Sequence, residues 1–378
     1  MIDVVIVGAG ASGLVTAIVA ARRGKKVLIL EKNIKVGKKL LATGNGKCNI
    51  TNQRPTLEHF YSQNPKFIAN VFEDYSYQSV KQFFKSIGLE LVEAKEGKVF
   101  PMSLQASSVV ELLVSECEQL GIEIICEAIV KKINHEENIF TVNYNETRVN
   151  CHKIVVATGH CSAPQLGGVI DGVSFARSFG HKIVKDFPTL VQLTSPHKER
   201  YLKRISGVKV ESRVSLRVGD RLIQKQGDIL FSNYGISGLA ILDISRFVMV
   251  ELLKKATVML TIDLMPKMSQ EQLLALMKKS LVKKSNKPLE VWMQGFINKK
   301  LILPILEPLK LQDETVGSIL LNIENLEAIV HGIKHFTFEV NGSKGYKGAE
   351  VATGGVDTKE VDAKTMESKK QKNLYVTG

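Results

Sequence analysis

The chain opens with short apolar runs on either side of a helical pattern. Residues 3–7 (DVVIV) and 26–30 are nearly continuous apolar runs, which is typical of strands buried on both faces of a parallel sheet. Between them, apolar residues recur at helical spacing from about residue 12 to 23, and Gly24 follows as a terminator. The pattern therefore predicts a strand–helix–strand unit with parallel strands.

Helical and extended patterns then follow one another up to about residue 188. Helices are expected at 66–86 and 104–120, and short strands at 89–93, 98–100, 123–126, 129–134, 138–143, 146–150 and 153–157. Short alternating segments at 190–262 favour an antiparallel barrel or sandwich. Helices are expected again at 269–330, opened by a capping box of Ser269 and Gln272, and strand character returns at 337–340.

The turn of the first unit has the sequence GAGASG. A helix that begins there presents unpaired N–H groups and the positive end of its dipole, so a phosphate can bind. Gly8 permits the tight turn, Gly10 leaves room for a pyrophosphate, and Gly13 lets helix and strand pack closely. Glu31 ends the second strand, where it can accept hydrogen bonds from an adenosine ribose. The predicted dinucleotide site comprises Gly8, Gly10, Ala11, Ser12, Gly13, Glu31 and Lys32.

Two further stretches are candidate cofactor contacts. In the polar loop at 36–52 (VGKKLLATGNGKCNITN), the amides of Gly44 and Gly46 could form a nest for phosphate or for polar flavin edges. A loop capped by its own Asn and Thr side chains is the alternative. Residues 154–159 (IVVATG) predict a strand end, where open α/β sheets bind ligands, although a simple turn gives the same pattern. The candidates are Lys38, Lys39, Thr43, Gly44, Asn45, Gly46, Cys48, Asn49, Ala157, Thr158 and Gly159.

Composition narrows the class of protein. The chain has 378 residues, 44% hydrophobic and 24% charged, which is typical of a globular protein with two or three domains. Apolar runs stay below the roughly 18 residues that cross a bilayer, and the apolar N-terminus lacks the basic segment of a signal peptide. The five cysteines form no CxxC pair and no metal-ligand spacing, so we expect no metal site, no disulfide framework and a cytoplasmic location.

The formal net charge is +13, which raises the question of an anionic partner. The lysine-rich segments at 278–287, 298–300 and 368–372 are dispersed and carry no interleaved aromatic residues. A solvated surface is therefore the favoured interpretation. We expect a small-molecule substrate and no membrane, and a nucleic-acid partner is disfavoured.

The order of motifs along nearly the whole chain resembles the aminoacetone-oxidase-like, BaiN-type family of NAD(P)/FAD-dependent oxidoreductases. The motifs are GAGASG, KKLLATGNGKCNITN, KVFPMSLQASSVV, ATGHCSAPQLG, DGVSFARSFGH, DILFSNYGISGLAILDISR, VATGGVDTKEVDAKTMESK and NLYVTG. The resemblance implies an α/β fold, with a Rossmann-type, glutathione-reductase-like FAD-binding domain, an inserted antiparallel β domain and a helical subdomain. FAD would place its pyrophosphate on residues 8–13, its adenosine ribose on Glu31, and its ribityl and isoalloxazine portions near Lys38, Lys39 and residues 43–49.

The resemblance also implies a domain order. The FAD-binding domain would occupy 1–188 and 351–378, the β-rich substrate domain 189–267 and 331–350, and the helical subdomain 268–330. In relatives the chain continues past the last motif with an acidic motif and a helix under the flavin. The segment 351–378 is therefore expected to be truncated, which bears on FAD retention.

The implied activity is oxidoreduction of a small organic substrate, with hydride transfer to or from flavin N5. Three active forms stay open: oxidation of an amine or carbonyl substrate by oxygen, NAD(P)H-dependent reduction of an activated double bond, and an RNA-associated flavoprotein. A non-enzymatic remnant is a further alternative, because the C-terminal segment is expected to be truncated. A second GxGxxG motif is lacking, so NAD(P)H is expected only as a transient co-substrate. Tyr234, with Asn233, is a candidate proton donor in the inserted domain, and a packing tyrosine is the alternative.

Overall fold

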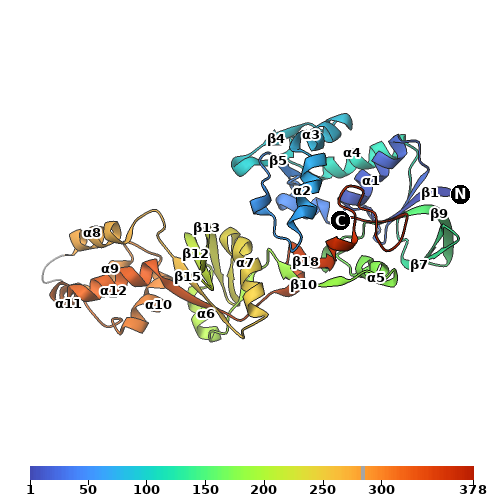
Figure 1. The fold of residues 1–378 in the computed structure, drawn as a ribbon. Coiled ribbons are helices and arrows are strands. Elements are labelled where there is room, and N and C mark those ends of the chain that lie inside the picture. The colour runs from blue at the N-terminus through green and yellow to red at the C-terminus, as the bar shows by residue number, and fades with distance from the viewer. Residues whose placement is uncertain (282–285) are drawn as a thin grey trace. The chain divides into compact units, whose positions relative to one another are not determined.

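The computed structural model describes residues 1–281 and 286–378, which form two compact units (Figure 1). The first unit comprises Met1–Asp186 and Gly354–Gly378, and the second Phe187–Thr353. The chain passes between them on strands β10 (Ile183–Thr189) and β18 (Val351–Val356), which pair with each other. The sequence analysis expected the FAD-binding domain at 1–188 and 351–378, and that division, with a separate helical subdomain at 268–330, stays a prediction.

The first unit is built on a seven-stranded sheet in the order β6-β2-β1-β9-β8-β7, with β19 paired to β9. The strands β6, β2, β1, β9 and β19 run parallel, whereas β7 and β8 add an antiparallel meander. The predicted parallel strand–helix–strand unit is confirmed. The strands are β1 (Ile2–Val7), β2 (Val27–Leu30), β6 (Glu123–Ile125), β7 (Val130–Glu136), β8 (Ile139–Tyr144), β9 (Thr147–Val156) and β19 (Leu374–Val376).

Strand β9 corrects the sequence prediction of separate strands at 146–150 and 153–157. It is one continuous strand of ten residues. Its first half pairs with β8 in the meander, and its second half pairs with both β1 and β19. The polar residues between the two apolar stretches therefore mark the point where the paired strand changes from β8 to β1 and β19, rather than a turn.

Four consecutive residues of β1, Val4–Val7, are buried. Since successive side chains of a strand point to opposite faces, both faces of the sheet are covered here. Val4 and Ile6 of β1 pack in a cluster with residues of helices α1 (Ala11–Arg22) and α4 (Ala106–Gln119). Val5 and Val7 pack in a second cluster with residues of β7 and β8 and with α5 (Asp171–Ser178). The continuous apolar run at the start of the chain thus supplies both cores.

The helix predicted at 66–86 is in fact two helices, α2 (Pro65–Asp74) and α3 (Tyr77–Ser86). The break falls at Ser76, whose hydroxyl accepts a hydrogen bond from the Ser79 amide and caps the second helix. Beside these helices lies a small antiparallel sheet in the order β3-β5-β4, formed by β3 (Thr51–Asn52), β5 (Lys98–Pro101) and β4 (Leu91–Glu93).

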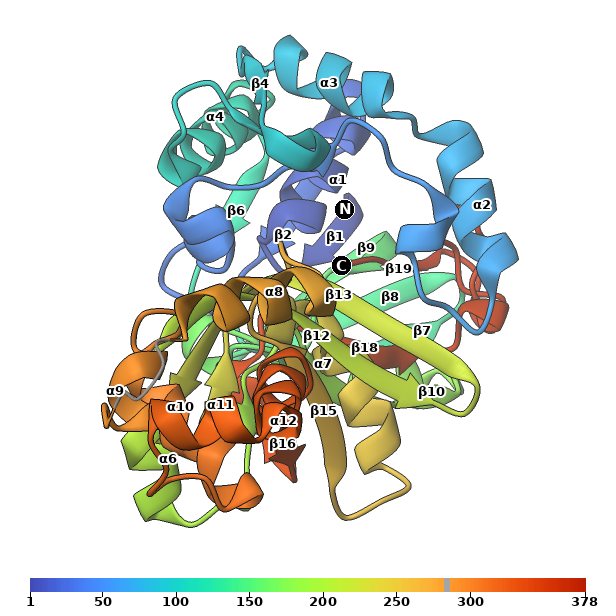
Figure 2. The ribbon, with the colours of Figure 1, turned by 90° about the vertical axis from the view of Figure 1, so that its left-hand side faces the viewer.

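The second unit contains another seven-stranded sheet, in the order β16-β15-β12-β13-β14-β11-β17. Its pairings are antiparallel, as predicted, but they form one open path rather than a barrel or a sandwich. Figure 2 shows this sheet with helices of the same unit in front of it. The strands are β11 (Leu193–Thr194), β12 (Lys209–Val218), β13 (Arg221–Ser232), β14 (Gly235–Ser237), β15 (Val258–Asp263), β16 (Phe336–Val340) and β17 (Gly342–Ser343).

The helices of the second unit share one hydrophobic core with its sheet. Helices α6 and α7 lie within the stretch where only strands were predicted. Ser269 and Gln272 form the predicted capping box at the start of α8. Its helices are α6 (Glu199–Ile205), α7 (Leu239–Leu252), α8 (Gln270–Ser280), α9 (Leu289–Met293), α10 (Lys299–Leu309), α11 (Val316–Leu321), α12 (Ile323–Lys334) and α13 (Gly345–Gly348).

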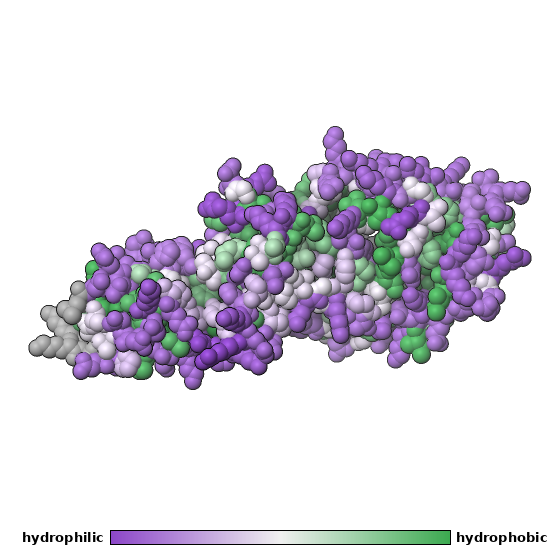
Figure 3. All heavy atoms as spheres, turned by 90° about the horizontal axis from the view of Figure 1, so that it is seen from below, coloured by the Kyte–Doolittle hydropathy of each residue, from purple (hydrophilic) through white to green (hydrophobic). Residues whose placement is uncertain are grey.

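The surface is largely hydrophilic on the face that Figure 3 shows, with smaller hydrophobic areas between the polar side chains. In the described part of the chain, no helix combines the length and apolar character needed to span a bilayer. Of the lysine-rich segment at 278–287, residues 282–285 lie outside the described residues.

Candidate functional site

The glycine turn joins the end of β1 to the start of α1. The Gly8 amide donates to the Leu30 carbonyl (2.8 Å), and the hydrogen-bond ladder of α1 begins with the Leu14 amide donating to Gly10 (3.0 Å). The amides of residues 11–13 precede this ladder and form the positive end of the helix. The first turn is uncharged, because it consists of Ala, Ser, Gly and Leu. An anion at this end would therefore meet backbone donors without competition from an acidic side chain.

Glycine stands at the three positions of the turn for different structural reasons. Gly8 has a φ of +109°, and a Cβ there would lie 2.5 Å from the Ala157 carbonyl oxygen. A Cβ on Gly13 would lie 1.9 Å from the Gly8 carbonyl oxygen. A Cβ on Gly10, in contrast, would meet no described atom within 4 Å, and Gly10 lines the pocket. Gly8 and Gly13 are therefore required by the fold, whereas Gly10 keeps the pocket open.

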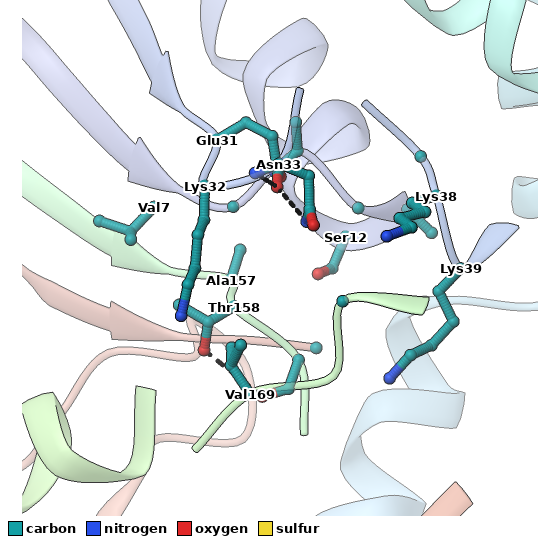
Figure 4. A pocket seen from close by; sticks show the side chains of 18 of the residues that line it. Val7, Ser12, Glu31, Lys32, Asn33, Lys38, Lys39, Ala157, Thr158 and Val169 are labelled. Carbon is teal, nitrogen blue, oxygen red and sulfur yellow. Dashed lines mark hydrogen bonds between the residues drawn. The ribbon is translucent and has the colours of Figure 1, made fainter. Parts of the chain in front are cut away.

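Glu31 is buried, with 7% of its surface exposed, and it has partners that the sequence did not predict. Its Oε2 accepts a hydrogen bond from the Ala9 amide (2.6 Å), and its Oε1 accepts from the amide and the side chain of Asn33 (2.8 and 2.6 Å). The carboxylate thus ties the glycine turn to the end of β2. Figure 4 shows Glu31 beside Asn33. Its hydrogen bonds to a ribose stay a prediction.

A pocket lies over the carboxyl ends of β1, β2 and β9. Figure 4 shows Ser12, Lys38 and Thr158 around the same space. Most of the predicted site residues line it: Gly8, Gly10, Ala11, Ser12, Glu31, Lys32, Lys38, Lys39, Thr43, Ala157, Thr158 and Gly159. A cradle of glycine backbone at a helix start, with room in front of Gly10, fits the pyrophosphate of a dinucleotide.

Sequence reasoning missed several lining residues near Glu31. Asp171 at the start of α5 forms an ion pair with Lys32, with 3.0 Å between Oδ2 and Nζ. Ala128, Val130 and Phe175 form an apolar wall nearby. Their segments are distant from the glycine turn in the sequence, so no local pattern connected them to it.

Lys39 closes the other end of the pocket. Its Nζ donates to the carbonyl oxygen of His160 (3.2 Å) and to the Ser162 hydroxyl (3.4 Å). Burial lowers the pKa of Lys39, and the nearby Cys161 thiolate would partly raise it again. The ammonium is thus held beside the turn that follows β9, next to Gly159 in the pocket wall.

The remaining loop candidates do not line the pocket. Gly44, Asn45 and Gly46 form a run of left-handed backbone, and a Cβ on Gly44 would approach the Asn49 amide to 2.9 Å. Cys48 is 2% exposed, and burial raises the pKa of its thiol, which supports an inert rather than a reactive cysteine. Contacts of these residues with a cofactor stay a prediction.

The proposed proton donors belong to the second unit. Tyr234 is half-buried at the turn between β13 and β14, and the Lys344 ammonium lies 4.0 Å from the centre of its ring. Its backbone carbonyl accepts a hydrogen bond from the Ser195 amide (3.0 Å), while Asn233 is exposed. A role of Tyr234 or Asn233 at the flavin stays a prediction.

Comparison with known proteins agrees with the site. Residues 2–378 match the family described as the HI0933-like protein Rossmann domain. A Haemophilus influenzae protein named ribosomal RNA dihydrouridine synthase is 33% identical, covering 99% of this chain and 90% of its own. A Clostridium scindens protein named 3-dehydro-bile acid delta(4,6)-reductase is 31% identical, covering 99% of this chain and 91% of its own. The solved 3-ketosteroid-delta4-(5alpha)-dehydrogenase of Rhodococcus jostii RHA1 is 14% identical, covering 100% and 90% of the chains, with a TM-score of 0.46.

The fold and the pocket define an FAD-binding oxidoreductase of the Rossmann type. The chain belongs to the HI0933-like family, which includes BaiN-type flavoproteins, as the resemblance predicted. FAD is therefore the cofactor that this pocket serves.

Proposed function

We propose that this protein is a flavin-dependent reductase of a carbon–carbon double bond conjugated to a carbonyl group. The observation that carries the proposal is the pair of relatives at 33% and 31% identity over nearly the whole chain. Their printed names, dihydrouridine synthase and delta(4,6)-reductase, both describe the addition of hydrogen to a carbon–carbon double bond. The two substrates differ widely in size, so the reaction is the property that they share.

The residues of this chain bind and orient the cofactor in the proposed reaction. FAD supplies the hydride chemistry when it is bound. The amides at the start of α1 would hold the pyrophosphate, because they are free of the helical hydrogen-bond ladder and Gly10, Ala11 and Ser12 line the pocket. Glu31 fixes the glycine turn through the Ala9 amide, which sets the position of those donors. Lys39, held by the His160 carbonyl at the other end of the pocket, would place a positive charge beside the far part of the cofactor.

The proposal is tested by anaerobic reoxidation of the FAD-loaded protein. The flavin is first reduced with dithionite, and 2-cyclohexenone or a steroid 4-en-3-one is then added without oxygen. We expect the visible absorbance of oxidised flavin to return as the saturated ketone forms. Reoxidation by oxygen alone, together with reduction of the flavin by aminoacetone or another amine, would instead establish an amine oxidase and reject the proposal.

We further propose NAD(P)H as the electron donor in the same reaction. The pocket is assigned to FAD and the sequence has no second GxGxxG motif, so a nicotinamide cofactor would approach transiently from elsewhere. NADH and NADPH should each be mixed anaerobically with the oxidised holoprotein. Bleaching of the flavin by one of them supports the proposal, and the absence of bleaching by both indicates another donor.

A pyrimidine in RNA is a second candidate substrate. The net charge of +13 and the relative named ribosomal RNA dihydrouridine synthase favour it. Binding of a ribosomal RNA fragment should then weaken steeply as salt is raised, because counterions are released from the phosphates. Reduced holoprotein should also convert uridine to dihydrouridine in that fragment, as mass spectrometry would detect. Failure of both at low salt leaves the small-molecule substrate.

A further inference from the structure

A group of potential metal ligands lies beside the cofactor pocket and takes no part in the proposed function. His160 and Cys161 follow β9, and Asp186 lies within β10. Their ligand atoms all lie within 4.8 Å of one another. All three residues belong to the first unit.

The distances within this group are close to those of a metal site. Cys161 Sγ lies 3.1 Å from His160 Nδ1 and 3.4 Å from Asp186 Oδ2. His160 Nε2 lies 4.0 Å from Asp186 Oδ2. Ligand atoms about 2.0–2.3 Å from a tetrahedral Zn²⁺ are themselves separated by roughly 3.3–3.6 Å. Cys161 Sγ and Asp186 Oδ2 already have this separation. An imidazole offers one nitrogen to an ion, and the ring of His160 would have to shift to bring Nε2 from 4.0 Å to this distance from Asp186 Oδ2 as the third ligand.

The imidazole of His160 provides a second observation. Its Nε2 is buried and has no hydrogen-bond partner among the described residues. A buried ring nitrogen without a partner loses its hydration and gains nothing in return. A bound cation would satisfy this nitrogen while the thiolate and the carboxylate supply negative charge.

We propose that His160, Cys161 and Asp186 form a binding site for a divalent transition metal such as Zn²⁺, with a fourth position open to water. The donor set selects this class of ion, because Zn²⁺ accepts sulfur, nitrogen and oxygen ligands. Ca²⁺ and Mg²⁺ require oxygen donors, of which the group provides a single carboxylate.

Lys39 sets the strength of this site. Its ammonium bonds to the His160 carbonyl at 3.2 Å, so its positive charge lies close to the ligands and opposes the incoming cation. The site therefore binds metal reversibly rather than as a permanent structural element. Because Lys39 and Gly159 also line the FAD pocket, the bound metal should perturb the flavin absorption spectrum.

The experiment is a titration of the purified holoprotein with Co²⁺, followed by competition with Zn²⁺. We expect one Co²⁺ per chain, with visible bands of tetrahedral cobalt at wavelengths beyond the flavin absorption, and loss of these bands as Zn²⁺ is added. Cys161→Ser should weaken binding by about tenfold or more, since a ligand is lost. Lys39→Met should tighten it, because the opposing charge is removed.

The matched control is Cys126→Ser, which changes another half-buried cysteine of the same unit, outside the ligand group. It should leave Co²⁺ affinity unchanged. Circular dichroism and FAD content establish that each variant is folded, and a misfolded Cys161→Ser is replaced by Asp186→Asn with the same expectation. The proposal is overturned if cobalt gives only octahedral spectra or if the tetrahedral bands persist in a folded Cys161→Ser protein.

Discussion

The most decisive test of the cofactor site is the substitution Gly10→Ala. Gly10 has φ −82° and ψ −169°, an extended conformation that alanine adopts freely. A methyl group there meets no described atom within 4 Å, and Gly10 lines the pocket that we assign to FAD. The apoprotein should therefore lose only the capping difference between glycine and alanine, about 1 kcal/mol or less.

The effect of Gly10→Ala on FAD binding should be much larger than its effect on stability. Forcing a methyl group into a filled contact costs about 1–3 kcal/mol. Each 1.4 kcal/mol changes a dissociation constant about tenfold, so FAD affinity should fall roughly 5- to 150-fold. FAD fluorescence titration of the apoprotein measures this change, and urea unfolding measures the stability.

Gly13→Ala is the matched control, because its methyl group would lie 1.9 Å from the Gly8 carbonyl oxygen and so collide with backbone. This variant should lose stability before any question of binding arises. The reasoning is refuted if a folded Gly10→Ala protein binds FAD with wild-type affinity, since the pyrophosphate would then lie elsewhere.

Three further predictions follow from buried groups. Glu31→Gln removes the charged acceptor of the Ala9 amide. A loss of roughly 1–2 kcal/mol should lower FAD affinity about 5- to 30-fold, which equilibrium dialysis would measure. An unchanged affinity would contradict the role of the hydrogen bond between Glu31 and the Ala9 amide in placing the glycine turn. Burial lowers the pKa of His181, so the folded state favours the neutral ring, and stability should be complete above the unfolded pKa of about 6.5 and fall as the pH drops below it. Urea unfolding between neutral and mildly acidic pH measures this slope, which should be shallower in His181→Gln; equal slopes would remove His181 as its source. Burial raises the thiol pKa of Cys117 and of Cys151 to about 11, so iodoacetamide should leave both unmodified in the native protein, with mass spectrometry as the readout and rapid labelling as the contrary result.

Local patterns were sufficient where neighbouring residues alone determine the structure. The strand, glycine turn and helix at the start of the chain were predicted because each has a signal in neighbouring residues. These signals are a continuous apolar run, a group of glycines and apolar residues at helical spacing. The capping box at Ser269 was predicted for the same reason. By contrast, Ser76 was missed as a helix start, since apolar residues on both sides continue the helical spacing through it.

Other features depended on distant partners. Strand β9 is continuous because β8 and β19 meet it at different residues, and neither neighbour is visible in its own sequence. Helix α7 was missed because its apolar residues are nearly continuous, and such a run fits a buried strand as well as a buried helix.

The sequence by itself determined the dinucleotide turn, the acid at the end of β2 and the family of the protein. Only the tertiary structure decided that Glu31 bonds to the Ala9 amide, that Asp171 pairs with Lys32, and that Asp186 joins His160 and Cys161. The physical reason is that a turn is specified by conformational preferences of adjacent residues, whereas these contacts join strands, helices and turns that are far apart in the chain and meet only in the folded structure.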